Sequence, residues 1–79
     1  MRKHFERMPL DMNNYLCIKV AKNWDGQYLA EVYQENRSGI RAVLFSCPFN
    51  FFNFAVQSAQ DFAIAYIEGL AKALHGEAE

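Results

Sequence analysis

The chain has 79 residues, of which 52% are hydrophobic and 15% aromatic, and its formal net charge is −1. This length supports one domain with a small core, and the hydrophobic content favours a folded chain over a disordered one. A net charge near zero gives no general electrostatic attraction to nucleic acid or to anionic lipid. We therefore expect residues 1–79 to form a single domain.

The first fourteen residues carry the weakest signal. Residues 2–8 could form one or two helical turns that end at Pro9, with Phe5 and Met8 on the same side. The alternative is an N-terminal leader, because Met12 offers a second start. Residues 1–14 are therefore either a leader or a short helix.

Residues 15–47 have the pattern of a three-stranded antiparallel meander. Two turns of the form Asn-x-x-Gly, at 23–26 and 36–39, separate runs of alternating β-branched and aromatic residues. A type I turn followed by a glycine with positive φ makes a three-residue hairpin loop with a bulge. Gly26 and Gly39 occupy the positions that this turn requires.

This turn type fixes the register of the three strands. It sets Val32 opposite Ile18 in the first strand and opposite Leu44 in the third. One face of the sheet is then apolar, with Leu16, Ile18, Val20, Tyr28, Ala30, Val32, Ala42 and Leu44. The other face pairs Lys19 with Glu31 and Glu35 with Arg41 across the ladder. This second face also holds apolar side chains that need a cover: Cys17, Leu29, Tyr33, Val43, Phe45 and Cys47.

Four phenylalanines lie within residues 49–54. We predict an irregular aromatic connector over residues 48–57, or a short fourth strand within 51–56 that returns beside the third. The sheet would then have three or four strands. These aromatic side chains either fill the core or form a binding surface, because exposed aromatic clusters mark partner sites.

Residues 58–76 are predicted to form an amphipathic helix. Ser58 with Asp61 is typical of a helix start, and Gly76 of a helix end. Gly69 would permit a close approach of the helix to the sheet. Apolar side chains recur at helical spacing: Phe62, Ala63, Tyr66, Ile67, Leu70, Ala73 and Leu74. The expected fold class is α+β, an antiparallel meander with one C-terminal helix packed on one face.

The sequence contains no recognisable catalytic, metal or cofactor motif. His4 and His75 have no Cys, Asp or Glu at ligand spacing, and no glycine-rich phosphate loop is present. Cys17 and Cys47 fall on strands that a third strand separates, beyond disulfide reach, and no cationic pattern near them in the sequence would lower a thiol pKa. We therefore expect a protein that is not an enzyme and binds neither cofactor nor metal.

The cysteines and the hydrophobic pattern also bear on the compartment. We find no signal peptide and no apolar span of about 18–20 residues. Two unpaired cysteines are typical of a reducing environment. These features predict a cytoplasmic protein without a membrane partner.

The order of predicted elements resembles that of double-stranded RNA-binding domains in topology. That family carries basic residues at the start of its last helix, where they meet phosphates, whereas residues 58–61 of this chain are SAQD. The remaining basic residues do not cluster in the sequence: Lys19, Lys22, Arg37 and Arg41. We therefore do not expect nucleic acid as a partner.

The general build, with its turns at 23–26 and 36–39 and its helix over 58–74, resembles small phage-encoded inhibitors, of which the anti-CRISPR proteins are the best-known group. The resemblance implies a non-enzymatic protein-binding module that docks on a bacterial immune effector, such as a CRISPR-Cas subunit, in the host cytoplasm.

The expected partner contacts lie on three parts of the chain. They are Tyr33, Val43 and Phe45 on the second sheet face, Phe49, Phe51 and Phe52 in the connector, and Trp24 and Arg37 at the turn tips. The alternative function is a structural homodimer that uses the same face or the strand 15–22 as a sheet edge. A third is a weak nucleic-acid-binding domain.

Overall fold

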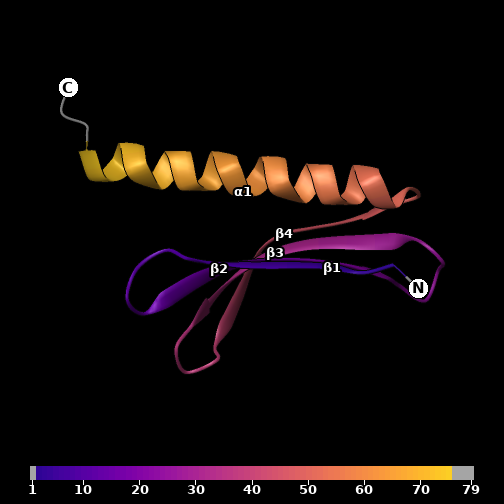
Figure 1. Ribbon diagram of the computed structural model, residues 1–79, viewed down its shortest axis with the longest axis horizontal. Helices are drawn as coiled ribbons and strands as arrows, with labels where there is room; N and C mark the ends of the chain where they lie inside the picture. Colours follow the sequence, from indigo (N-terminus) through magenta and orange to yellow (C-terminus); the bar gives the residue numbers. More distant parts are fainter. Residues whose placement is uncertain (1, 76–79) are drawn as a thin grey trace.

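The computed structural model describes residues 2–75, which form a four-stranded antiparallel sheet and one helix. In chain order, the elements are β1 (His4–Pro9), β2 (Asn14–Lys22), β3 (Tyr28–Asn36), β4 (Arg41–Phe49) and α1 (Phe52–His75). The strands lie side by side in that order, and α1 covers one face of the sheet (Figure 1). The expected α+β class, an antiparallel meander with a C-terminal helix on one face, is confirmed. The predicted helix end at Gly76 lies outside the described residues.

Both predicted turns are confirmed in detail. Gly26 has a φ of +80° and Gly39 a φ of +87°, the conformation that only glycine adopts without strain. The side-chain oxygen of Asn23 accepts a hydrogen bond from the backbone N–H of Gln27 at 3.0 Å. Asn36 closes the second turn in the same way. Local side chains therefore specify both hairpins, and the register between β2 and β3 is the predicted one.

The predicted register of β4 is wrong at one point. Val32 lies opposite Phe45 rather than Leu44, because a bulge follows Val32 and leaves Leu44 as an extra residue. An extra residue moves all later side chains to the other face of the sheet. Phe45 and Cys47 therefore lie on the helix side of β4 and not on the face away from α1. The bulge lets both Leu44 and Phe45 pack against the core.

The N-terminal segment is neither an irregular leader nor a helix. Residues 4–9 form β1, which pairs with β2 along its whole length. Its alternate residues face α1, where the Glu6 carboxylate accepts a hydrogen bond from the Gln60 amide at 2.7 Å. This hydrogen bond and a second one from His4 lower the pKa of Glu6. Because β1 covers it, β2 is an interior strand, and the predicted sheet edge at residues 15–22 is wrong.

The helix begins at Phe52, six residues before the predicted start at Ser58. Residues 48–57 are therefore neither an irregular connector nor a fourth strand: Pro48 and Phe49 end β4, and α1 follows almost at once. Tertiary contacts explain the early start, since Ala55 is buried and Phe52 packs against the core. Within residues 2–75, no helix is both long and apolar enough to cross a membrane.

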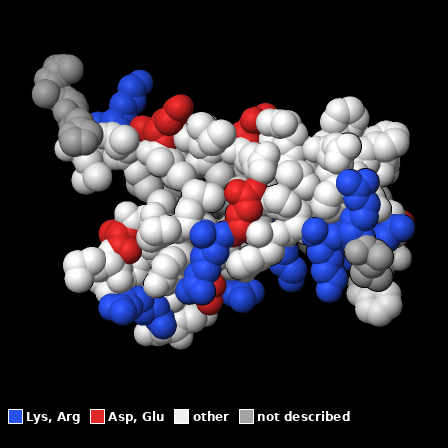
Figure 2. All heavy atoms as spheres, in the orientation of Figure 1, with Lys and Arg blue, Asp and Glu red and all other residues white. Residues whose placement is uncertain are grey.

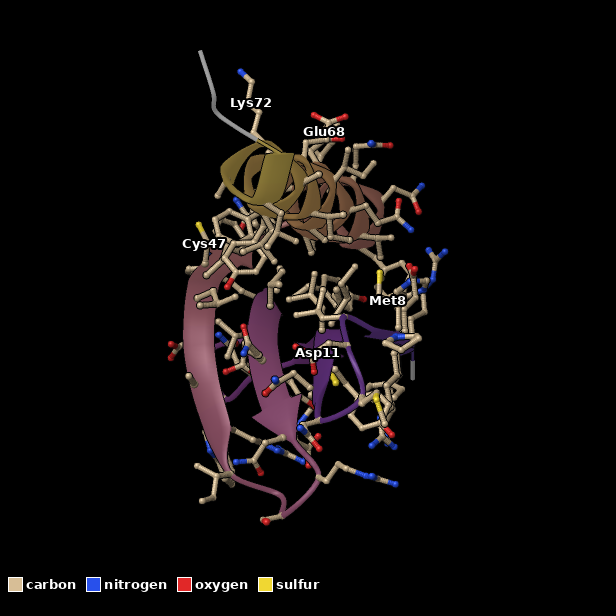
Figure 3. The ribbon with its side chains drawn as sticks, turned by 90° about the vertical axis from the view of Figure 1, so that its left-hand side faces the viewer. Met8, Asp11, Cys47, Glu68 and Lys72 are labelled. Carbon is tan, nitrogen blue, oxygen red and sulfur yellow. The ribbon has the colours of Figure 1, made fainter. Side chains whose placement is uncertain are left out.

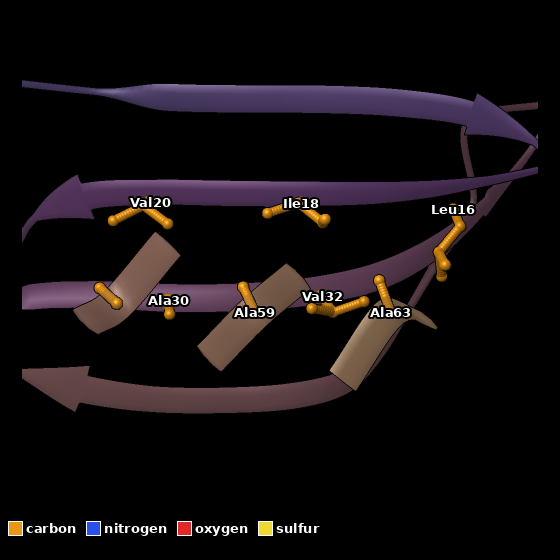
Figure 4. Packing of buried hydrophobic residues seen from close by; sticks show 8 residues of the cluster. Leu16, Ile18, Val20, Ala30, Val32, Ala59 and Ala63 are labelled. Atoms are coloured by element: carbon orange, nitrogen blue, oxygen red, sulfur yellow. The ribbon is translucent and has the colours of Figure 1, made fainter. Parts of the chain in front are cut away.

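The core lies between α1 and the middle strands. Its buried side chains are Leu16, Ile18 and Val20 of β2, Ala30 and Val32 of β3, and Ala55, Ala59 and Ala63 of α1 (Figure 4). The three alanines recur every four residues, so they form one small-residue stripe that lets the helix approach the sheet. The predicted close approach at Gly69 is wrong, because Gly69 is exposed and nothing lies within 4 Å of its Cβ position.

Candidate interaction surfaces

Four of the eight predicted contact residues belong to the interior. Tyr33 is only 4% exposed, and Phe45, Phe49 and Phe52 are half-buried against the core. Phe45 stacks on Phe62 of α1, with 5.1 Å between the ring centroids. Phe49 and Phe52 thus fill the core, one of the two roles that the sequence left open for them, and Phe45 packs there too although it was predicted on the second face. The eight predicted residues thus do not form one surface.

The sheet face opposite α1, which we call the outer face, covers only part of its apolar surface, because Phe5 and Val43 stay exposed. Cys17 and Tyr33 lie opposite one another on β2 and β3, and both are buried. The Arg41 guanidinium lies 4.7 Å from the Tyr33 ring centroid, and that of Arg7 lies 4.0 Å from the Tyr15 ring centroid. Arginine stems can cover apolar surface while the charge stays in water. Side chains of the outer face thus cover Cys17 and Tyr33, but not Val43.

The two cysteines differ in environment. Burial raises the pKa of the Cys17 thiol, and the Glu35 carboxylate raises it further. Cys47 is partly exposed, and neither cysteine is in a disulfide. Since the thiolate is the reactive form, Cys47 should react first with a thiol reagent.

We expect a chromogenic disulfide reagent to modify one thiol per folded chain quickly and the second only on unfolding. Cys47→Ser should abolish the fast phase, because the remaining thiol is buried and its pKa is raised. The absorbance time course in native buffer and in denaturant measures this. A fast phase that persists in C47S would show that Cys17 is accessible.

The other four predicted contacts are exposed but scattered. Trp24 and Arg37 lie at the two turn tips, Val43 lies on β4, and Phe51 lies just before α1. Phe51 makes an edge-to-face pair with Phe54, with 5.7 Å between the ring centroids, and both rings are exposed. Phe54 was not among the predicted contacts. This pair is a small aromatic patch at the N-terminal end of α1.

A groove of about 640 Å³ lies beneath the C-terminal half of α1, and we call it the α1 groove. It was not predicted. Its apolar lining includes Met8, Leu10, Tyr66, Ile67, Leu70 and Leu74. Asp11 is the one charged residue in this lining. In Figure 3, Met8 and Asp11 lie on the sheet side of α1, whereas Glu68 and Lys72 point away from the sheet.

The α1 groove exists because the helix extends farther than the sheet that covers it. The 24 residues of α1 span about 36 Å, and the hairpin between β3 and β4 bends away from the helix (Figure 1). Leu70 and Leu74 lie on the same stripe as the buried Ala63, yet they are 38% and 83% exposed. The sequence placed both leucines on the buried stripe, but it gave no sign that the sheet ends before them.

Polar groups hold the other wall of the groove in place. The Asp11 carboxylate accepts a hydrogen bond from the Asn13 backbone N–H at 2.8 Å and others from the Asn14 side chain. These bonds lower the pKa of Asp11, led by the one from Asn13. The Tyr66 hydroxyl donates to the Gln34 side-chain oxygen at 3.0 Å. The Asp11 carboxylate and the Tyr66 hydroxyl are thus paired within the chain, and most of the free surface of the groove is apolar.

Within the described part of the chain, no three His, Cys, Asp or Glu side chains lie close enough together to hold a metal ion. Comparison of the chain with protein-family models, with curated proteins and with solved structures found no match. The inference of function therefore rests on the surfaces described above.

Proposed function

We propose that this chain is a non-enzymatic protein-binding module whose docking surface is the α1 groove. The observation that carries the proposal is the apolar stripe of α1, which continues through Leu70 and Leu74 beyond the sheet. Contiguous apolar side chains beside an apolar groove mark sites of protein contact. Complete burial of one leucine side chain is favourable by about 1.5–3 kcal/mol. Burial of Leu70 and Leu74 would therefore contribute to the free energy of binding of a partner in the groove.

The occupant that we propose is a second copy of the chain. The α1 groove offers a ridge, Leu70 and Leu74, beside a hollow lined by Leu10 and Ile67. A two-fold axis would place the ridge of each copy in the hollow of the other. In such a symmetric dimer, the ridge and the hollow of both copies are buried, so no other partner is required.

Light scattering during size exclusion, at about 10 to 100 µM protein, tests the proposal. The expected molar mass is about 18 kDa, twice the 9.1 kDa of the chain. Leu74→Glu should shift the mass toward the monomer, because it puts a charge at the centre of the interface. Each copy loses a contact worth about 2 kcal/mol, so the two-fold dimer loses about 4 kcal/mol and its dissociation constant rises roughly 900-fold.

The matched control is Ile64→Glu, which makes the same change at another exposed apolar residue of α1 outside the α1 groove. I64E should remain a dimer, and circular dichroism should show both variants folded. A monomeric wild type at about 100 µM would exclude the second copy as occupant. Equal dissociation of L74E and I64E would show that the α1 groove is not the interface.

A second candidate is a phage or mobile-element inhibitor that docks on a bacterial immune effector in the host cytoplasm. Its support is the resemblance to anti-CRISPR proteins together with the exposed Phe51–Phe54 pair. This pair lies at the other end of α1, so a dimer through the α1 groove leaves it free. If light scattering gives a monomer, this candidate becomes the preferred one, with an unrelated protein as the occupant of the groove.

A further inference from the structure

The outer face carries a shallow trough that is separate from the α1 groove. It consists of two adjoining hollows, each of about 230 Å³. The side chains that line it include Lys3, Phe5, Lys19, Arg41, Lys22 and Trp24. Lys19, on β2, lines both hollows, so the trough is continuous from the edge strand β1 to the turn after β2.

An exposed aromatic side chain stands at each end of the trough. Phe5 is 58% exposed on β1, and Trp24 is fully exposed at the turn tip. Phe5 lies opposite Lys19 in the ladder, and Trp24 follows Lys19 by five residues. At about 3.3 Å per residue, the two ends are at most about 16 Å apart along β2.

Basic side chains outnumber acidic ones slightly on this side of the sheet. The outer face carries Lys3, Arg7, Lys19 and Arg41 against Glu31, which lines the trough opposite Lys19, Glu35 and, in the turn, Asp25. Lys22 reaches the trough from the end of β2, and its ammonium lies 5.6 Å from the Tyr28 ring centroid on the helix side. Among these groups, the ion pair that the structure describes is Arg41 with Glu35 at 3.8 Å. The helix carries one basic residue, Lys72, and Figure 2 shows the Lys and Arg side chains gathered along the sheet.

We infer that this trough is a binding site for single-stranded nucleic acid. Proteins bind single-stranded nucleic acid by stacking its bases on exposed aromatic side chains and by placing Lys or Arg side chains beside its phosphates. The trough provides both, with Lys19 between two aromatic ends. Sequence analysis did not find this cluster, because Lys3 and Phe5 lie beside Lys19 only when residues 4–9 form β1, which was not predicted to be a strand. The trough and the α1 groove lie on opposite sheet faces, so this inference is independent of the dimer.

Trp24 is the only tryptophan of the chain, so its fluorescence reports on the trough directly. We expect a thymidine oligonucleotide of about ten residues to quench it at about 50 mM salt. If the four basic residues of the trough meet phosphates, log K should fall with a slope of about −0.7 per contact, or roughly −2.8 in total. The affinity should then fall about 50-fold between roughly 50 and 200 mM salt.

Two lysine variants provide a matched pair. Lys19→Ala should weaken binding and reduce the slope by about 0.7, because one phosphate contact is lost. Lys72→Ala removes the same charge from the far side of α1 and should leave both quantities unchanged. Phe5→Ala should weaken binding with little effect on the salt slope, because it removes stacking rather than charge.

Four results would overturn the inference. The first two are the absence of quenching by about 100 µM oligonucleotide at low salt and equal losses of affinity in K19A and K72A. Equal affinity for duplex DNA would show that the trough binds phosphates alone. Quenching by anionic phospholipid vesicles, without quenching by the oligonucleotide, would assign the trough to a membrane surface. Circular dichroism of K19A and F5A checks that both variants are folded.

Discussion

Tyr33→Ala should reduce the free energy of unfolding by about 2–4 kcal/mol, as truncation of a buried aromatic side chain does. Tyr33 lies on the outer face, where a sheet side chain would ordinarily be open to solvent. It is instead 4% exposed, because Arg41 covers its ring and Cys17 lies directly across the ladder. Urea unfolding followed by circular dichroism measures the loss.

The matched control is Val43→Ala, because Val43 lies opposite Tyr33 on β4 and is 60% exposed. We expect V43A to stay within about 0.5 kcal/mol of the wild type. All variants are compared at one protein concentration, since the stability of a dimer depends on it. If Tyr33→Ala leaves the free energy of unfolding unchanged, Tyr33 does not stabilise the fold. Its side chain would then be available to a partner, as the sequence analysis predicted.

The meander could be predicted because its determinants are local. Asn23 and Gly26 lie within four residues of each other and together fix the first hairpin, through a side-chain hydrogen bond and a positive φ. Asn36 and Gly39 repeat the arrangement in the second hairpin. A turn of known type sets the register of the strands on either side, so two short motifs determine most of the sheet.

The first strand could not be predicted, because its side-chain pattern is inverted. Phe5 faces solvent, whereas Glu6 and His4 face the helix side, so the alternation that identifies a strand is absent. The carboxylate of Glu6 is satisfied by Gln60, which lies 54 residues later in the chain. Glu6 can therefore face the helix side of the sheet only because the fold brings Gln60 beside it.

The same reasoning applies to the bulge and to the interaction surfaces. Whether Leu44 or Phe45 faces Val32 depends on how well each packs against Phe62 of α1, which no local pattern reports. The α1 groove depends on where the sheet ends relative to the helix. The trough depends on the antiparallel pairing of β1 with β2, which places residues 3–5 beside residues 19–24. Sequence patterns therefore identify apolar and basic residues without saying which of them meet.

Ala59→Leu tests the contact that holds the two layers together, and we expect it to destabilise the fold by about 1–3 kcal/mol, the usual cost of overpacking a core. Ala59 is fully buried between α1 and the sheet, at the centre of the stripe that includes Ala55 and Ala63 (Figure 4). A leucine there must move the helix away from Ile18 and Val32 or adopt a strained rotamer. Thermal or urea unfolding measures the effect.

Ala65→Leu is the control, because Ala65 is exposed on the same helix and the volume change is identical. Leucine is nearly as good a helix former as alanine, so A65L should leave stability within about 0.5 kcal/mol of the wild type. If A59L is as stable as A65L, the helix is not held close to the sheet at the alanine stripe. The layers would then be joined mainly by the aromatic contacts on either side, such as Phe45 on Phe62.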